Sequence, residues 1–238
     1  MTSTYGDRSL RSVAIVIAAA GRGERLGGEL PKALEQVAGV SLLEYCVHVI
    51  AGMRGLGAVV VAAPDGYLAD VEEICARLTK PGATVVAGGS TRTESVSNAL
   101  AVMPDGIDIV LVHDAARAFT PVEQFLDVIA AVEAGADAVI PGLAVVDTIK
   151  EVDASGSVLR TVPRDSLRGV QTPQGFRRET LDAVHRDENV DGATDDAGMI
   201  EASGGLVKVI PGHPDAFKVT TPFDRLIALA LVTSRSVQ

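Results

Sequence analysis

A glycine-rich loop with three basic side chains is the stretch of the sequence best suited to chemistry. Residues 17–34 read IAAAGRGERLGGELPKAL, with four glycines and the basic residues Arg22, Arg25 and Lys32. Backbone N–H groups of such a loop can surround phosphate oxygens, because glycine permits a close approach. Arginine and lysine can neutralise the negative charge that grows during phosphoryl or nucleotidyl transfer. The loop therefore predicts phosphate chemistry, and a solvated surface loop is the alternative.

The spacing of the glycines argues against two common phosphate-binding loops. A dinucleotide-binding turn needs G-x-G-x-x-G with a helix beginning inside it. Here the third glycine is displaced, and Pro31 stands where that helix would run, at a cost of about 3 kcal/mol. A P-loop needs G-K-S/T, which is missing here. We expect a long, irregular loop after the first strand, at the sheet edge where open α/β folds bind ligands.

Further motifs follow this loop in order, and together they resemble one family. They are A-A-G-x-G-x-R and P-K within 19–32, GGSTRTESV at 88–96, HDAAR at 113–117, DTIK at 147–150, TPQGF at 172–176, TDDA at 194–197 and KVT at 218–220. The first is similar to the loop of nucleotidyltransferases that activate sugar or alditol phosphates. The ordered set covers nearly the whole chain and resembles the 2-C-methyl-D-erythritol 4-phosphate cytidylyltransferases of the non-mevalonate isoprenoid pathway.

The resemblance implies a reaction between CTP and 2-C-methyl-D-erythritol 4-phosphate that gives CDP-methylerythritol and pyrophosphate. A phosphate oxygen of the alditol phosphate attacks the α-phosphorus of CTP in line, without a covalent enzyme intermediate. Two polyanions must meet, so positioning and fixed positive charge should carry most of the catalysis. The resemblance assigns the catalytic charge stabilisation to Arg25 and Lys32.

The resemblance also implies two sets of binding residues. Nucleotide binding falls to Ala19, Ala20, Gly21, Gly89, Ser90, Ser95 and Ala115. Positioning of the substrate phosphate falls to Asp114, Arg117, Thr148, Arg164, Thr172 and Lys218. Lys218 lies between apolar neighbours, so we expect it on an apolar strand with an anionic partner, whereas His113 is expected to be structural.

The carboxylates form no compact cluster that would hold a metal. Asp195 and Asp196 follow a threonine and are expected to begin a helix. Mg²⁺ is therefore expected as the divalent cofactor, bound through the CTP phosphates rather than in a protein metal site.

Strands that end at one sheet edge must position these residues. Apolar runs predict buried strands at 13–19, 58–63, 84–87, 107–112, 136–140 and 206–210. Helical spacing predicts helices at 41–53, 68–78, within 88–100, at 121–134, 178–186 and 195–203. A last helix is expected to begin at Thr221. This alternation predicts an α/β fold with a doubly wound, mostly parallel Rossmann-like sheet of the nucleotidyltransferase type, as a single domain over residues 1–238.

The alternation breaks at about 143–168. Two β-like stretches, 145–152 and 158–162, flank Asp-Ala-Ser-Gly-Ser and predict a hairpin without a helix between its strands. Its exposed edge needs a cover, which a second subunit would provide. We expect a projecting β-arm used for homodimerisation, and the resemblance implies that Thr148 and Arg164 reach from it into the neighbouring subunit's site.

The composition supports this interpretation. Hydrophobic residues make up 47% of the 238 residues and aromatic residues only 3%, which suits a parallel sheet covered by helices. The net charge of −10 disfavours a nucleic-acid polymer as partner. Cys46 and Cys75 are expected to be reduced core thiols. The chain begins without a targeting signal and has no membrane-spanning run, so we expect a cytoplasmic protein without a membrane partner.

Other functions remain open at the level of the sequence. A cytidylyltransferase for another alditol phosphate, such as ribitol 5-phosphate, would have nearly the same nucleotide half. A dinucleotide-binding oxidoreductase and a non-catalytic nucleotide-binding module belong to different classes. Pro31 and the displaced glycine disfavour the oxidoreductase, and the module would not need Lys32.

Overall fold

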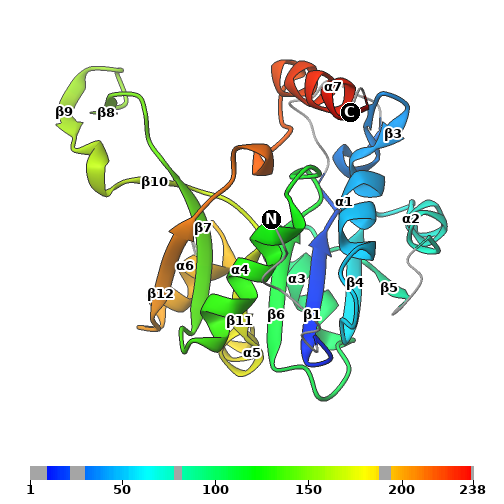
Figure 1. The fold of residues 1–238 in the computed structure, drawn as a ribbon. Helices are drawn as coiled ribbons and strands as arrows, with labels where there is room; N and C mark the ends of the chain where they lie inside the picture. The colour runs from blue at the N-terminus through cyan, green and yellow to red at the C-terminus, as the bar shows by residue number, and fades with distance from the viewer. Residues whose placement is uncertain (1–9, 22–29, 78–81, 188–193, 237–238) are drawn as a thin grey trace, which may run out of the picture.

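The computed structural model of the chain describes residues 10–21, 30–77, 82–187 and 194–236. Within them a central sheet runs in the order β10-β7-β11-β6-β1-β4-β5, and β12 also pairs with β7 (Figure 1). Its strands are β1 (Val13–Ala18), β4 (Ala58–Ala63), β5 (Ala83–Ala87), β6 (Ile109–Asp114), β7 (Ala138–Ala144), β10 (Arg168–Val170), β11 (Gln174–Arg177) and β12 (Val207–Pro211). The pairs β1–β4, β1–β6, β4–β5 and β7–β12 are parallel.

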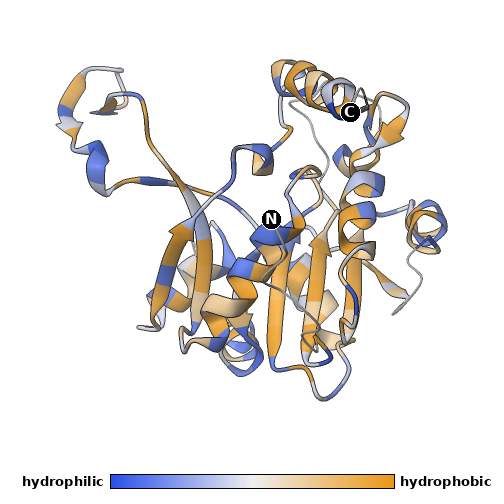
Figure 2. Cartoon of the chain, viewed as in Figure 1, coloured by the Kyte–Doolittle hydropathy of each residue, from blue (hydrophilic) through white to orange (hydrophobic). Residues whose placement is uncertain are grey.

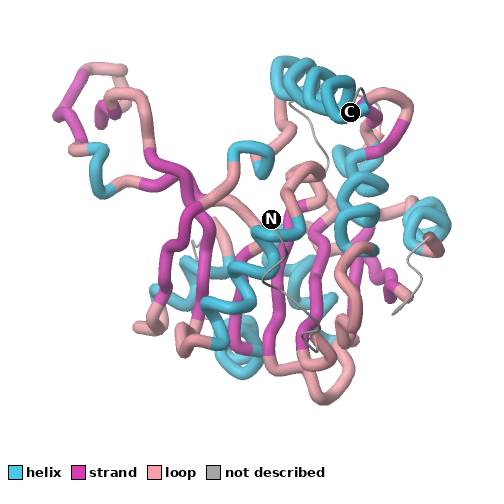
Figure 3. Tube along the Cα trace, in the orientation of Figure 1, coloured by secondary structure: helices cyan, strands magenta, loops and turns pink. Residues whose placement is uncertain are grey.

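Helices cover both faces of this sheet. They are α1 (Leu42–Ala51), α2 (Leu68–Cys75), α3 (Arg92–Ala101), α4 (Val122–Glu133), α5 (Arg178–Arg186) and α6 (Asp196–Ala202), and α7 (Pro222–Ser236) follows last. Figure 3 shows them in cyan around the magenta strands. The central strands are coloured mostly as hydrophobic in Figure 2, as the predicted buried sheet requires.

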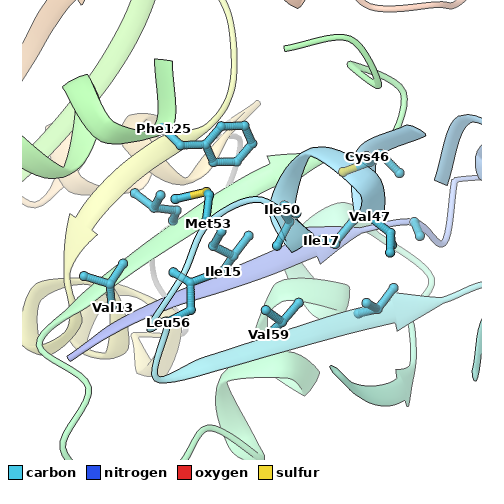
Figure 4. Close-up of a cluster of buried hydrophobic side chains, with 14 of the residues drawn as sticks. Val13, Ile15, Ile17, Cys46, Val47, Ile50, Met53, Leu56, Val59 and Phe125 are labelled. Atoms are coloured by element: carbon cyan, nitrogen blue, oxygen red, sulfur yellow. The ribbon is translucent and has the colours of Figure 1, made fainter. Parts of the chain in front are cut away.

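Successive residues of β1 enter different cores on the two faces of the sheet. Val13, Ile15 and Ile17 pack on one face with α1, α2 and α4, and Figure 4 shows part of this core. Ala14 and Val16 pack on the other face with α3, α5 and α6. Two helical layers on a mostly parallel sheet confirm the predicted doubly wound α/β fold.

Local hydrogen bonds explain where several helices begin. The Ser41 side chain accepts from the Glu44 backbone N–H (3.1 Å), and the Glu44 carboxylate accepts from the Ser41 N–H (2.9 Å), which starts α1. Thr221 caps α7 in the same way with an acid three residues later. Asp195 accepts from the Gly198 N–H (2.9 Å), so this aspartate begins α6 as predicted.

Two short antiparallel strands complete the sheet, and the sequence analysis missed both. β11 lies between β6 and β7 and is antiparallel to each, and β10 pairs with the end of β7. A Cβ atom at Gly175 of β11 would lie only 2.3 Å from Val128 of α4. The sheet therefore needs glycine at this position, because α4 packs directly over it.

β7 continues through Pro141 and Gly142 to Ala144, so the predicted end of this strand at residue 140 is wrong. On one edge of β7, β11 pairs with Ala138 and Val139, and β10 pairs only from Gly142 onward. Pro141 lies between these two partners. A residue that lacks an N–H donor is tolerated at such an interruption of the ladder.

The predicted hairpin arm is present. β8 (Ile149–Val152) and β9 (Val158–Val162) form a separate two-stranded antiparallel sheet, which projects away from the central sheet (Figure 1). The Asp153 carboxylate closes the turn by accepting from the Ser155 and Ser157 backbone N–H groups. Val158 and Leu159 are about three-fifths exposed, at 58% and 60%. Among the described residues, no element covers these two apolar side chains, and an isolated hairpin is at best marginally stable in water.

Candidate active site

The carboxyl ends of β1, β4 and β6 meet at one edge of the sheet. Ala18 is in register with Ala62 on one side and with Asp114 on the other. Beyond β1, the Ala19 N–H donates to the Ala62 carbonyl (3.0 Å), and the Ala115 N–H donates to the Ala18 carbonyl (3.2 Å). The structure thus brings the predicted nucleotide-binding residues Ala19 and Ala115 together at adjacent strand ends.

The two ends of the glycine loop also meet at this edge. The Lys32 backbone N–H donates to the Gly21 carbonyl (3.2 Å), and Lys32 opens a short 3-10 helix, Lys32–Leu34, whose last two residues are buried. Arg25 belongs to the segment 22–29, which lies outside the described residues. The prediction of a long, irregular loop after β1 falls mostly on the same segment and stays a prediction; the first described element after it is this 3-10 helix.

The second glycine pair lies against the first loop. A Cβ atom at Gly88 would be 2.2 Å from the Cβ of Ala20, so this glycine lets the two segments touch. The Gly89 N–H donates to the Ser95 hydroxyl oxygen (3.0 Å), and the Ser95 hydroxyl donates to the Thr91 carbonyl (2.8 Å). Ser95 is buried. Ala20 and the Gly88–Gly89 segment therefore lie together next to the end of β1, and the buried Ser95 hydroxyl fixes the Gly89 backbone.

Ser90 lies at the exposed rim of this surface. Its hydroxyl and its backbone N–H both donate to the Glu94 carboxylate, each at 2.6 Å. These hydrogen bonds, the Ser90 hydroxyl first, lower the pKa of Glu94. Glu94 also completes a capping box with Thr91 at the start of α3. The Ser90 hydroxyl is thus held by a neighbouring carboxylate rather than by the buried part of the site.

Asp114 at the end of β6 is the centre of a charged cluster. Its Oδ2 contacts the Lys218 ammonium (2.7 Å), and its Oδ1 accepts from Arg92 Nε (3.2 Å). Burial by itself would raise the pKa of Asp114, but Arg92 and Lys218 outweigh burial and hold it well below its usual range. Asp114 is therefore an anion at neutral pH, with cations on both sides.

The predicted anionic partner of Lys218 is thus Asp114. The expected apolar strand around Lys218 is absent from the described chain: residues 217–220 are irregular and lie between the 3-10 helix Pro214–Ala216 and α7. A backbone hydrogen bond from Val219 N–H to Ala116 carbonyl (2.9 Å) fixes this segment, and Val219 is buried. This single hydrogen bond, to a residue just beyond β6, holds the Lys218 segment without the repeated backbone hydrogen bonds of a strand.

The Thr172 side chain fixes the backbone of Asp114. Its hydroxyl oxygen accepts from the Asp114 backbone N–H (3.0 Å) and lies 3.0 Å from Nδ1 of His113. Burial lowers the pKa of His113 from 6.5 to about 4, and the ring packs against Phe125 with centroids 4.8 Å apart. His113 is therefore neutral at pH 7 and has a structural environment, as expected.

Arg117 ties two segments together. Its Nη1 donates to the Ala216 carbonyl (2.7 Å), and its Nη2 donates to the Val170 carbonyl (3.1 Å). The guanidinium therefore joins the base of the arm to the segment that carries Lys218. In this arrangement Arg117 holds two backbone segments at the edge of the site, and its predicted contact with the substrate phosphate stays a prediction.

Thr148 and Arg164 lie apart from this cluster. Both are exposed, and Arg164 Nη1 donates to the Val146 carbonyl within the arm. Figure 1 shows the arm extending away from the ends of β1 and β6. The chain does not bring these two predicted residues to its own Asp114.

Arg92 is the site residue that the sequence analysis overlooked. It lies within the GGSTRTESV motif and opens α3, where a cation faces the positive end of the helix dipole. Besides Asp114, it contacts Asp196 (Nη1 to Oδ2, 2.5 Å). A cation is unfavourable at a helix start, and this is the signal in the sequence that favours a carboxylate partner for Arg92.

The donor set does not fit a metal held by the protein. Among residues 10–21, 30–77, 82–187 and 194–236, no group of three His, Cys, Asp or Glu side chains could hold a metal ion. Asp114 and Asp196 are both occupied by cationic side chains. In the same described residues, no helix combines the length and apolar character needed to cross a membrane.

The comparisons with known proteins agree on one family. The family described as IspD, 2-C-methyl-D-erythritol 4-phosphate cytidylyltransferase, matches residues 13–234. Two curated proteins of that name are similar: one from Saccharopolyspora erythraea is 51% identical over 93% of this chain and 99% of its own, and one from Frankia casuarinae is 49% identical over 92% and 81%. The crystal structure of the Thermus thermophilus enzyme of the same name has a TM-score of 0.73 and 34% identity over 91% of this chain and 97% of that one.

Proposed function

Because this chain belongs to the 2-C-methyl-D-erythritol 4-phosphate cytidylyltransferase family, we infer that it joins CTP to 2-C-methyl-D-erythritol 4-phosphate. The products are CDP-methylerythritol and pyrophosphate, and the reaction belongs to isoprenoid precursor biosynthesis. The observation that carries this conclusion in the structure is the meeting of both glycine motifs with Asp114 and Lys218 at one sheet edge.

We propose that the edge is divided between the two substrates. The nucleotide lies on Ala20, Gly21 and Gly89, and Ser90 contacts it at the rim. Ala19, Ser95 and Ala115 are buried and shape this surface from within. Several of these residues offer backbone atoms, and glycine and alanine allow a triphosphate to approach closely. The acceptor phosphate lies on the Lys218 side of Asp114.

The chemical step needs positive charge rather than a nucleophile from the protein. A phosphate oxygen of the acceptor attacks the α-phosphorus of CTP in line, and pyrophosphate leaves with the bonding electron pair. Lys32 and Arg25 stabilise the negative charge on the α-phosphoryl group while both oxygens are partly bonded. The Lys32–Gly21 backbone contact supports this role, because it places the start of the Lys32 side chain at the end of β1.

The acceptor is held by a second set of residues in this proposal. Lys218 binds its phosphate, while Thr172 and Arg117 keep Asp114 and the Lys218 segment in place. Thr148 and Arg164 complete the grip on the phosphate from the arm of a second subunit. The exposed arm supports this arrangement, because Val158 and Leu159 stay uncovered by the described residues and the arm extends away from the ends of β1 and β6 (Figure 1).

In this scheme the CTP phosphates, rather than side chains of the protein, would hold the Mg²⁺. Hard divalent cations bind nucleotide phosphate oxygens and keep much of their water. When bound, Mg²⁺ supplies charge neutralisation to the triphosphate. The protein residues named above do the positioning, and none of them is required as a metal ligand.

We further propose that residues 1–238 act as a single nucleotidyltransferase domain in a cytoplasmic homodimer. The net charge of −10 supports small anionic substrates gathered by local cations over a nucleic-acid polymer.

The acceptor is tested by pyrophosphate release with CTP and either methylerythritol phosphate or ribitol 5-phosphate. We expect turnover with methylerythritol phosphate and little with ribitol phosphate. Robust turnover with ribitol phosphate alone would favour the other alditol phosphate. Nucleotide binding without pyrophosphate release from either acceptor would favour the non-catalytic module.

The shared site is tested by mixing two inactive variants. Arg25→Ala removes the loop side of the site, and Arg164→Ala removes the arm side. If subunits exchange, mixed dimers contain one intact composite site, so partial activity should return. Exchange verified by differential labelling, without any return of activity, would contradict the shared site.

A further inference from the structure

The Arg92 guanidinium bridges carboxylates from two distant parts of the chain. Nε donates to Asp114 Oδ1 (3.2 Å) at the end of β6, and Nη1 donates to Asp196 Oδ2 (2.5 Å) in α6. The other terminal nitrogen, Nη2, is buried and has no hydrogen-bond partner among the described residues. A planar fork can serve two carboxylates at once in a way that a lysine ammonium cannot.

A ring of contacts, closed through the backbone of α3, holds this guanidinium in place. The second oxygen of Asp196 lies 3.0 Å from His185 Nε2, and His185 Nδ1 lies 2.9 Å from the Ser97 hydroxyl oxygen. Ser97 belongs to α3, as Arg92 does, so the ring returns to the helix on which it began. The side chains of Asp196 and His185 are 0% and 4% exposed. Polar contacts are strong and geometrically demanding in such a buried setting.

Asp114 divides its charge between two cations. Arg92 occupies Oδ1, and the Lys218 ammonium lies 2.7 Å from Oδ2. The Lys218 side chain is 41% exposed, so it can also face a ligand. The more fully Arg92 compensates Asp114, the less firmly that carboxylate retains Lys218.

We propose that Arg92, held by the Asp196–His185–Ser97 ring, is a positioning residue for the acceptor phosphate. It fixes Asp114 and thereby sets the location and availability of the Lys218 ammonium. This inference rests on the proposed function, which assigns Lys218 to that phosphate. It predicts an effect on the acceptor rather than on CTP, because Asp114 contacts Lys218 directly.

The test measures KM for methylerythritol phosphate and for CTP separately in full-length Arg92→Gln. The acceptor KM should rise about tenfold, since removing one partner of a desolvated charge pair has at least that effect. The KM for CTP should change by less than about twofold. Arg178→Gln is the matched control: Arg178 pairs with Asp182 at 2.7 Å, with a side chain 21% exposed against 25% for Arg92, and neither KM should change.

A double variant separates positioning from stability. Arg92→Gln alone leaves the buried Asp196 charge without its cation, which destabilises the fold. Arg92→Gln/Asp196→Asn removes both charges, so thermal stability should recover while the acceptor KM stays raised. Arg92→Lys restores a positive charge without the fork and should return the acceptor KM only part of the way.

Two results would overturn the inference. One is an acceptor KM that returns to the wild-type value in the double variant, which would make Arg92 purely structural. The other is an equal rise of both KM values in Arg92→Gln.

Calorimetric binding of inorganic phosphate tests the same coupling without turnover. Arg92→Gln should bind it about tenfold more weakly than the wild type, and Lys218→Gln more weakly still. Equal binding by the wild type and Arg92→Gln would contradict the inference. If the wild type uses neither alditol phosphate but shows this loss, the proposed function fails while the positioning role stands.

Discussion

The edge of the central sheet and the hairpin arm carry similar charged residues in opposite environments. At the edge, Arg92 bridges two buried carboxylates. On the arm, Arg160 pairs with Glu151 at 2.5 Å, yet their side chains are 66% and 46% exposed. Charge pairs in the interior are costly to break, whereas pairs in solvent contribute little. The comparison teaches that the charged side chains at the sheet edge are fixed by contacts within one chain, whereas those on the arm remain exposed to solvent.

The strongest challenge to this comparison is Asp196→Ala. Removing Asp196 leaves the buried Arg92 guanidinium with one carboxylate instead of two and takes the hydrogen-bond partner from His185 Nε2, so the free energy of unfolding should fall by about 3 kcal/mol. Urea unfolding monitored by circular dichroism measures this change. A fall in the free energy of unfolding of less than about 1 kcal/mol would show that the Arg92–Asp196 pair contributes no more than an exposed surface pair.

Lys32→Ala tests the catalytic half of the edge. The activation barrier should rise by about 3–4 kcal/mol, a loss of roughly 10²–10³ in kcat, if Lys32 stabilises charge in the transition state. The melting temperature should change little. Lys208→Ala on β12 is the control, because this exposed lysine lies outside the proposed site. Near-normal turnover by Lys32→Ala would contradict the assigned role.

Acid should lower the free energy of unfolding through protonation of His113, which precedes Asp114 at the end of β6. Burial lowers its folded-state pKa from 6.5 to about 4, so the unfolded chain binds the extra proton first. This contribution is complete above pH 6.5 and is lost as the pH falls towards 4, with a size of about 3 kcal/mol. Urea unfolding at several pH values gives the free energy of unfolding as a function of pH. In His113→Gln this free energy should depend less steeply on pH between 6.5 and 4. An unchanged slope in that variant would exclude His113 as the cause.

The smallest expected effect belongs to the arm. Arg160→Ala should change the free energy of unfolding by about 0.5 kcal/mol or less, because an exposed pair competes with water and salt. The same urea titration used for Asp196→Ala measures it. A loss comparable with that of Asp196→Ala would show that the arm pair is buried in the assembled protein.

Much of the fold follows from local patterns in the sequence. Apolar runs predict β1 and β4 within a residue of their observed limits, and helical spacing predicts α5 at its observed bounds. The hairpin and the caps at Ser41 and Asp195 follow from residue types at fixed offsets. Periodicity could not reveal β10 and β11, because each is too short to show alternation and depends on distant partners.

The site was predictable only in part, for a related reason. The glycine loop and the exit of β6 indicate the correct edge, since parallel strands place their carboxyl ends together. The Arg92–Asp196 contact joins residues that are 104 positions apart, so no local pattern could pair them. The irregular backbone around Lys218 is likewise set by one tertiary hydrogen bond rather than by its apolar neighbours.

The antiparallel strand in the middle of the sheet has a consequence for how the chain assembles on the ribosome. β1, β4, β5 and β6 can pair as soon as the first half of the protein has emerged. β7 cannot pair with β6 directly, because β11 lies between these two strands in the sheet. β11 is complete only when synthesis reaches residue 177. Until then the nascent chain exposes an unpaired edge of β6, the kind of surface that chaperones shield during translation.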